Sequence, residues 1–127
     1  MTGRIDIGMQ GEELAAAYLS AWGWSIAARR WRDGTPHGLK TDIDIVALSP
    51  DGVYHFVEVK TRTAAPGPDR RPEAAVTPAK AQRMIRAAER YMAAGKLDGE
   101  IAIDLIAVVL DGGSETPVIR YYADVAR

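Results

Sequence analysis

Two short apolar stretches joined by a tight turn constrain the fold of this chain more than any other feature. Residues 43–48 are mostly apolar, and residues 53–60 follow after the sequence Pro50-Asp51-Gly52. Proline, aspartate and glycine at this spacing favour a reversal of the chain between two extended segments. The pattern therefore predicts a β-hairpin near the middle of the sequence.

Periodic stretches on both sides of this hairpin predict the order α-β-β-β-α-β-β. Apolar residues at helical spacing predict a first helix over residues 7–22. Thr77-Pro78 predicts the start of a second helix, which runs to about Ala94, because threonine caps helices and proline favours the first helical position. The remaining predictions are strands over 24–31, 101–110 and 118–125, and loops over 33–38 and 63–76.

The same spacing predicts which side chains face the core. Leu14, Tyr18 and Trp22 lie four residues apart and, with Ala15 and Leu19 beside them, form one apolar stripe on the first helix. Trp24, at the start of the next strand, is also predicted to be a core residue. On the second helix a helical wheel gathers six apolar side chains on one side: Ala81, Met84, Ile85, Ala88, Tyr91 and Met92.

Length and composition are those of one globular domain spanning residues 1–127. The hydrophobic fraction is 47%, which argues against disorder, and the chain has no cysteine. Disulfides, thiol chemistry and cysteine-based zinc sites are therefore excluded. No stretch is apolar for long enough to cross a bilayer, and the first residues contain no apolar signal region. We expect a soluble cytoplasmic protein that has no membrane partner.

Basic residues are concentrated in the middle of the chain, although the net charge is only -1. Residues 60–90 carry eight lysines and arginines and three acidic residues, whereas acids outnumber bases in both flanking segments. A basic region between acidic flanks is compatible with a polyanionic partner. The alternative is an ordinary solvated helix and loop.

Acidic residues on both arms of the predicted hairpin indicate a metal site. Asp42 and Asp44 share one face of the first arm, and Glu58 and Lys60 share one face of the second. Carboxylates that converge repel one another, and a Mg²⁺ or Mn²⁺ ion relieves that repulsion. The alternative is a surface ladder in which Glu58 and Lys60 pair with neighbouring strands. His37 and His55 are predicted to have no catalytic or metal-binding role.

Four segments of the sequence resemble a known family. They are residues 11–15 (GEELA), 42–46 (DIDIV), 56–62 (FVEVKTR) and 75–80 (AVTPAK). Together they resemble the YraN family of bacterial proteins, which is grouped with the PD-(D/E)xK nucleases and is similar to archaeal Holliday-junction resolvases. The resemblance covers roughly residues 8 to 110. It implies a restriction-endonuclease-like α/β core, with a mixed central sheet flanked by helices and an extra strand at the C-terminus.

The resemblance also implies a metal-dependent endonuclease and assigns its catalytic residues. Asp44 and Glu58 match the two acidic metal ligands, which would hold Mg²⁺ or Mn²⁺ together with the carbonyl of Val59. Glu12 matches an acidic residue on the first helix that completes the site in resolvase-like proteins. Lys60 matches the motif lysine, which positions or activates the attacking water.

DNA, branched or otherwise structured, is the substrate that the resemblance implies, and a homodimer is the implied assembly. A row of basic residues would contact its phosphates: Arg62, Lys80, Arg83, Arg86 and Arg90. The chain departs from the family at Thr41-Asp42, where Gly-Glu is usual, and at Ala102-Ile103-Asp104, where Arg-Phe-Asp is common. The rival interpretations are a non-catalytic nucleic-acid-binding module with the nuclease fold and a protein-protein adaptor.

Overall fold

The computed structural model describes residues 4–32, 42–63, 76–110 and 116–126. Its helices and strands follow the predicted order. They are α1 (Arg4–Ala21), β1 (Ser25–Trp31), β2 (Ile43–Leu48), β3 (Tyr54–Arg62), α2 (Pro78–Ala94), β4 (Ile101–Val109) and β5 (Val118–Tyr122).

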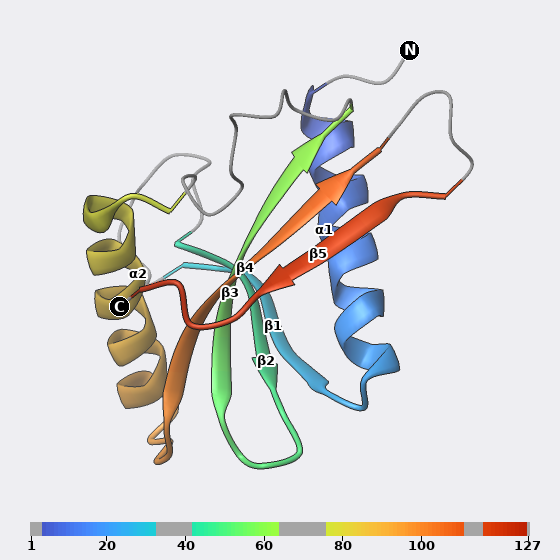
Figure 1. Cartoon of the computed structure of the whole chain (residues 1–127). Helices are drawn as coiled ribbons and strands as arrows, with labels where there is room; N and C mark the ends of the chain where they lie inside the picture. The colour runs from blue at the N-terminus through green and yellow to red at the C-terminus, as the bar shows by residue number, and fades with distance from the viewer. Residues whose placement is uncertain (1–3, 33–41, 64–75, 111–115, 127) are drawn as a thin grey trace.

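The five strands form one mixed sheet in the order β1-β2-β3-β4-β5. Neighbouring strands are antiparallel except for β3 and β4, which are parallel and are connected through α2. A parallel pair needs such a crossover, and its central strands are covered on both faces. Figure 1 shows α1 on one side of the sheet and α2 on the other. The mixed sheet flanked by helices is the architecture predicted from the sequence.

Helix α1 covers one face of the sheet through small and aliphatic side chains. Ala15 and Leu19 are fully buried against Ile45 of β2 and Val57 of β3. Gly11 allows the helix to approach the sheet closely, because a Cβ atom there would lie 1.8 Å from Oγ1 of Thr61. The middle of α1 therefore lies directly against Thr61, near the C-terminal end of β3.

Helix α2 covers the opposite face and packs on side chains of the alternate register. Met84 and Ala88 are buried with Val46 of β2 and Phe56 of β3. The helix begins as predicted, because the Thr77 side chain accepts a hydrogen bond from the backbone N–H at position 80 over 3.2 Å. This cap fixes the backbone of the first turn of α2.

The predicted apolar stripe of α1 is confirmed only in part. Its members Ala15 and Leu19 are fully buried, whereas Leu14 and Tyr18 are only half-buried and Trp22 is 41% exposed. The helical period was correct, but the buried face is centred on Ala15 and Leu19 rather than on the larger side chains beside them. Trp22 instead contacts the rings of Tyr18, Trp24 and Tyr121.

Smaller differences concern the ends of elements and the core of α2. The last strand ends at Tyr122 rather than 125, and β3 continues to Arg62 rather than 60. Ile85 and Tyr91 are half-buried, and Ala87 is fully buried although it was not predicted to be. His37 and most of the two predicted loops lie outside the described residues. No helix among those residues is long and apolar enough to span a bilayer.

Candidate functional site

The candidate site begins where β2 and β3 stop pairing. Their last paired residues at this end are Ile45 and Val57. Beyond this point a side chain of β2 takes the place of its backbone as the partner of β3. The Oδ2 atom of Asp44 accepts a hydrogen bond from the Val59 N–H at 2.8 Å. The carboxylate thus occupies the opening between the two strands, and Glu58 lies next to it on β3.

Asp44 is held in an electrostatically unfavourable position. Burial raises the pKa of its carboxyl group to about 7, and the nearby Glu58 charge acts in the same direction. The hydrogen bond from the Val59 N–H lowers the pKa, while the Glu12 charge and a hydrogen bond with the Glu58 side chain raise it. Acidic side chains from α1 and β3 therefore both raise the pKa of the Asp44 carboxyl group on β2.

Glu58 has a partner on the helix rather than on a neighbouring strand. Lys80 Nζ lies 3.1 Å from Glu58 Oε2, and the two side chains are 26% and 14% exposed. The predicted alternative, a ladder of ion pairs across the sheet, therefore does not describe Glu58. Because Lys80 lies in the first turn of α2, the Thr77 cap also determines where its side chain begins.

Glu12 is paired with a basic residue of the edge strand β1. Arg30 Nε donates to Glu12 Oε1 at 3.0 Å, and the Glu12 side chain is only 13% exposed. Arg30 has a φ of 54°, a left-handed conformation that is unfavourable for a side chain of its size. Glu12 and Asp44 both contribute to raising the Arg30 pKa, which means that all three groups lie near one another.

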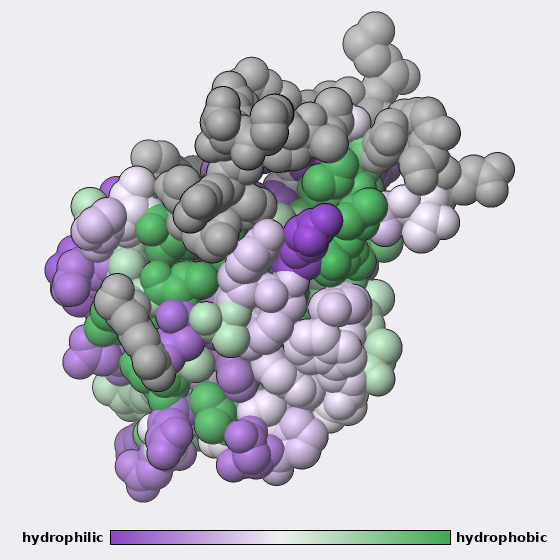
Figure 2. Space-filling view, viewed as in Figure 1, coloured by the Kyte–Doolittle hydropathy of each residue, from purple (hydrophilic) through white to green (hydrophobic). Residues whose placement is uncertain are grey.

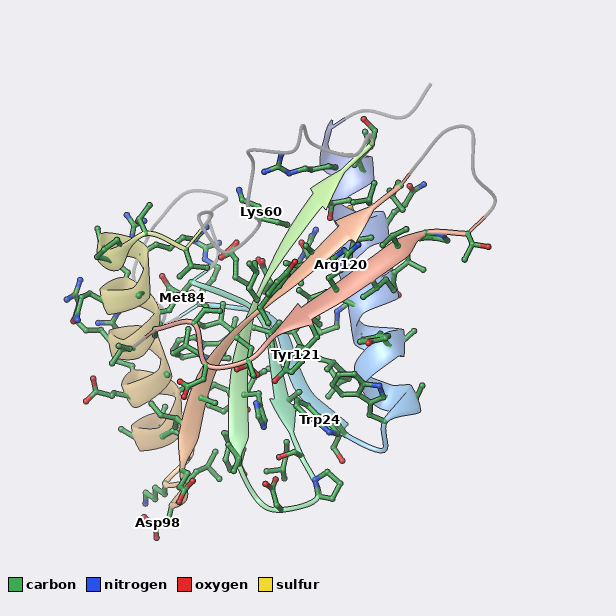
Figure 3. The ribbon with its side chains drawn as sticks, in the orientation of Figure 1. Trp24, Lys60, Met84, Asp98, Arg120 and Tyr121 are labelled. Carbon is green, nitrogen blue, oxygen red and sulfur yellow. The ribbon has the colours of Figure 1, made fainter. Side chains whose placement is uncertain are left out.

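Lys60 lies two residues beyond Glu58 on β3 and is exposed. It forms no ion pair with any residue in the described part of the chain. Residues 58 and 60 share the face of the sheet that α2 covers. Figure 3 labels Lys60 in the C-terminal half of β3.

Asp42 lies at the entry to β2. Its backbone N–H donates to the carbonyl of Trp31 at 3.0 Å, which holds the chain entering β2 against β1.

The donors at this site fit a hard divalent cation in kind. Asp44 and Glu58 supply adjacent carboxylate oxygens, which Mg²⁺ and Mn²⁺ prefer. Burial is the main cause of the raised Asp44 pKa and the Glu58 charge adds to it, and a bound cation would offset both. Glu12 is directed to Arg30. Within the ranges that the structure describes, no three acidic, histidine or cysteine side chains converge closely enough to hold a metal.

Comparison with known proteins identifies the family. The model of the uncharacterised protein family UPF0102 matches residues 11–108. This chain belongs to the UPF0102 family. The finding confirms the resemblance to the YraN family. The matched segment includes the whole acidic cluster, together with Lys60 and Lys80.

Several UPF0102 proteins resemble this chain along most of its length. A Streptomyces coelicolor relative is 40% identical over 128 residues, which cover 99% of this chain and 92% of the relative. A Chlorobaculum parvum relative is 41% identical over 118 residues, covering 91% and 84%. One from Oleidesulfovibrio alaskensis is 40% identical over 114 residues, or 89% of this chain, which spans only 52% of that protein.

The predicted basic row continues from the acidic cluster along the outer side of α2. Arg83, Arg86 and Arg90 are exposed, and Arg62 is half-buried at the end of β3. Figure 2 shows hydrophilic side chains gathered over α2. Lys80 is a member of this row and also forms the ion pair with the Glu58 carboxylate. The basic side of α2 therefore begins at a residue that contacts Glu58, the carboxylate beside Asp44.

A second polar network was missed by the sequence interpretation. Asp104 of β4 is completely buried, and His55 Nδ1 lies 2.6 Å from its Oδ2 atom. The Tyr121 hydroxyl donates to the same oxygen at 2.5 Å, and the Asp124 N–H donates to Oδ1 at 2.9 Å. His55 Nε2 lies 3.1 Å from the Ser49 hydroxyl. Figure 3 shows Trp24 and Tyr121 from opposite edges of the sheet converging on this region.

The order serine, histidine and aspartate in this network invites comparison with a catalytic triad. A triad needs an accessible serine whose hydroxyl proton is directed to the histidine. Ser49 is only 7% exposed, and its hydroxyl donates to the Asp51 carboxylate instead. The network therefore connects the β2–β3 turn with β4 and β5. A single aspartate inside the apolar run Ile101–Val109 was the signal that could have revealed it.

Proposed function

We propose that this protein is a metal-dependent phosphodiesterase that cuts DNA, with branched or otherwise structured DNA as its substrate. The observation that supports this most strongly is the Asp44–Glu58 pair. Two adjacent carboxyl groups, one with a pKa near 7, lie where two strands separate and where a basic helix begins. Such an arrangement is unfavourable without a cation and is typical of functional sites.

The residues have distinct roles in this proposal. Asp44, Glu58 and the Val59 carbonyl would hold Mg²⁺ or Mn²⁺, with Glu12 assisting. The ion would supply Lewis-acid stabilisation of the scissile phosphate. Lys60 is exposed on the same face of β3 as Glu58, so its ammonium group can orient the attacking water or offset phosphate charge.

The basic side chains of α2 would bind the phosphates on either side of the cut. Arg83, Arg86 and Arg90 lie along one side of the helix, and contacts of this kind are independent of base sequence. A homodimer would present two such sites to the two strands of a junction. Both the substrate shape and the dimer extend the resemblance to resolvases and are part of the proposal.

A second candidate is a nucleic-acid-binding module without catalytic activity. The observation that favours it is that Glu58 and Glu12 are both paired with basic side chains, which could serve as permanent counter-ions. Such a module would bind DNA through α2 with a strong dependence on salt concentration and would not require a metal.

Cleavage assays distinguish the two candidates. Labelled four-way junction, flap and linear duplex are incubated with Mg²⁺, Mn²⁺ or EDTA, using wild type, Asp44→Asn and Lys60→Ala. We expect metal-dependent cutting that falls by at least about a hundredfold in both variants. Asp98→Asn, which removes an exposed carboxylate elsewhere, serves as the matched control and should cut normally. Salt-sensitive binding without any cutting by wild type would favour the binding module.

A further inference from the structure

Two basic side chains from different elements neutralise the two acids that flank Asp44. Lys80 of α2 lies 3.1 Å from Glu58, and Arg30 of β1 lies 3.0 Å from Glu12. The two carboxylates are 14% and 13% exposed, whereas the basic side chains are 26% and 44% exposed. In each pair the acid is fixed inside the site and the base reaches it from the solvent side.

The local backbone restricts the position of both basic residues. Arg30 has a φ of 54°, a left-handed backbone conformation that is unfavourable for a residue other than glycine. Lys80 belongs to a capped helix turn, which restricts the origin of its side chain. Both bases thus reach the acids that flank Asp44 from backbone positions that are locally restricted.

We propose that Lys80 and Arg30 are displaceable counter-ions, which a divalent cation releases from Glu58 and Glu12 and which then bind the phosphates of the DNA. The inference rests on the proposed function and adds a step to it. A cation of charge +2 beside Asp44 competes for the same carboxylate oxygens and repels both basic groups. The substrate supplies new negative charge immediately outside the site.

Permanent positioning of the acids is the contrary possibility, and the two make opposite predictions about metal affinity. If the bases compete with the metal, removing one should tighten metal binding. If the bases hold the carboxylates in a ligating geometry, removing one should weaken it. Ion pairs of this exposure are worth about 0.2–1 kcal/mol, which corresponds to as much as about a fivefold change in affinity.

The first experiment measures Mn²⁺ binding by calorimetry on the full chain without DNA. Lys80→Gln and Arg30→Asn should each bind Mn²⁺ about two- to fivefold more tightly than wild type, and their combination about tenfold more tightly. Asparagine is chosen because it tolerates a left-handed backbone. Lys96→Asn is a matched control, since Lys96 is exposed with a φ of 52° and lies at the far end of α2. It should bind Mn²⁺ like wild type.

The second experiment measures DNA binding against salt concentration, with Ca²⁺ replacing the catalytic metal and with EDTA. Each phosphate contact contributes about 1 to the slope of log affinity against log salt. Lys80→Gln should lower this slope by about 1 in Ca²⁺ and leave it unchanged in EDTA, where Lys80 is paired with Glu58. Lys96→Asn should match wild type under both conditions.

The outcomes separate this inference from the proposed function. Weaker or unchanged Mn²⁺ binding by both variants, with wild type binding normally, would overturn the counter-ion role and leave the nuclease proposal intact. An equal change of slope in Ca²⁺ and in EDTA would also overturn it. Absence of Mn²⁺ binding by folded wild type would overturn both proposals together.

Discussion

Asp104 on β4 and Asp44 on β2 are both aspartates withdrawn from water in the same sheet, and their surroundings are opposite. Asp104 is completely buried, yet Tyr121 and the Asp124 N–H donate to it, and His55 lies within hydrogen-bonding distance. Asp44 accepts one backbone hydrogen bond, from Val59, and is surrounded by two further acids. The more deeply buried carboxylate is therefore the better compensated one.

The difference shows that burial by itself does not mark a functional carboxylate. A buried carboxylate whose oxygens are satisfied by hydrogen bonds belongs to the framework, and its loss should destabilise the fold. A buried charge beside like charges is a source of free energy that a bound cation can use. Substitutions of these two aspartates and of their partners test this distinction between a framework carboxylate and a functional one.

Asp104→Ala should produce the largest loss of stability, about 3–5 kcal/mol, because it leaves buried partners without an acceptor. Urea denaturation of the metal-free proteins measures this loss. Asp98→Ala removes an exposed carboxylate and should change the free energy of unfolding by less than about 0.5 kcal/mol. A small effect of Asp104→Ala would mean that the hydrogen bonds of Asp104 contribute little to stability and that Asp104 is not a framework residue.

Asp44→Asn should instead stabilise the metal-free protein, and increasingly so as the pH rises. The folded-state pKa of about 7 exceeds the ordinary value of 3.8, so the folded protein binds more protons between these values. Wild-type stability contributed by this group is therefore present at pH 4 and lost by about pH 7. Asparagine does not titrate, and its advantage should grow by on the order of 2–4 kcal/mol over this range.

Denaturation midpoints measured in EDTA at several pH values test this expectation. Asp98→Asn is the control, and it should follow the wild-type pH dependence. If the denaturation midpoints of Asp44→Asn and wild type differed by the same amount at pH 5 and pH 8, then the pKa of Asp44 would not be raised in the folded protein.

Mn²⁺ should stabilise wild type and leave Asp44→Asn nearly unchanged. A ligand that binds only the folded state adds about 2.7 kcal/mol at a hundred times its dissociation constant. Thermal unfolding with increasing Mn²⁺ measures the shift, and Asp104-directed variants that still fold should retain it. Stabilisation of Asp44→Asn equal to that of wild type would locate the cation elsewhere.

Tyr121→Phe should have the smallest effect, a loss of about 1–2 kcal/mol, because it removes one of the donors to Asp104. Metal-dependent cleavage should be unaffected, since Tyr121 lies in the framework network. A cleavage rate that fell with no change in stability would connect the two regions and remove the distinction between them.

The sequence correctly predicted those elements whose signals lie within a few neighbouring residues. Thr77-Pro78 identified the start of α2, and the turn at Pro50-Asp51-Gly52 identified the hairpin, because capping and turn preferences act within a few residues. Strand alternation likewise predicted that Glu58 and Lys60 share one face. Glu12, in contrast, was assigned to the site only through the family resemblance, because no local pattern connects α1 with the hairpin.

The missed features depend on contacts between distant residues. The partners of Asp104 come from the β2–β3 hairpin and from β5, and no spacing rule connects those positions. The exposure of Trp22 depends on which side of α1 meets the sheet, whereas helical spacing gives only the period. The Lys80 contact with Glu58 likewise required the crossover between two parallel strands.

The parallel pairing of β3 with β4 has a consequence for how the site forms. Glu12, Arg30, Asp44, Glu58 and Lys80 come from five successive elements, α1 to α2. Because β3 and α2 are held together by the crossover to β4, the contact between Glu58 and Lys80 exists only in the assembled fold. A metal that binds only this fold should therefore slow the hydrogen exchange of amides that open in global unfolding, and not merely that of amides near the ion.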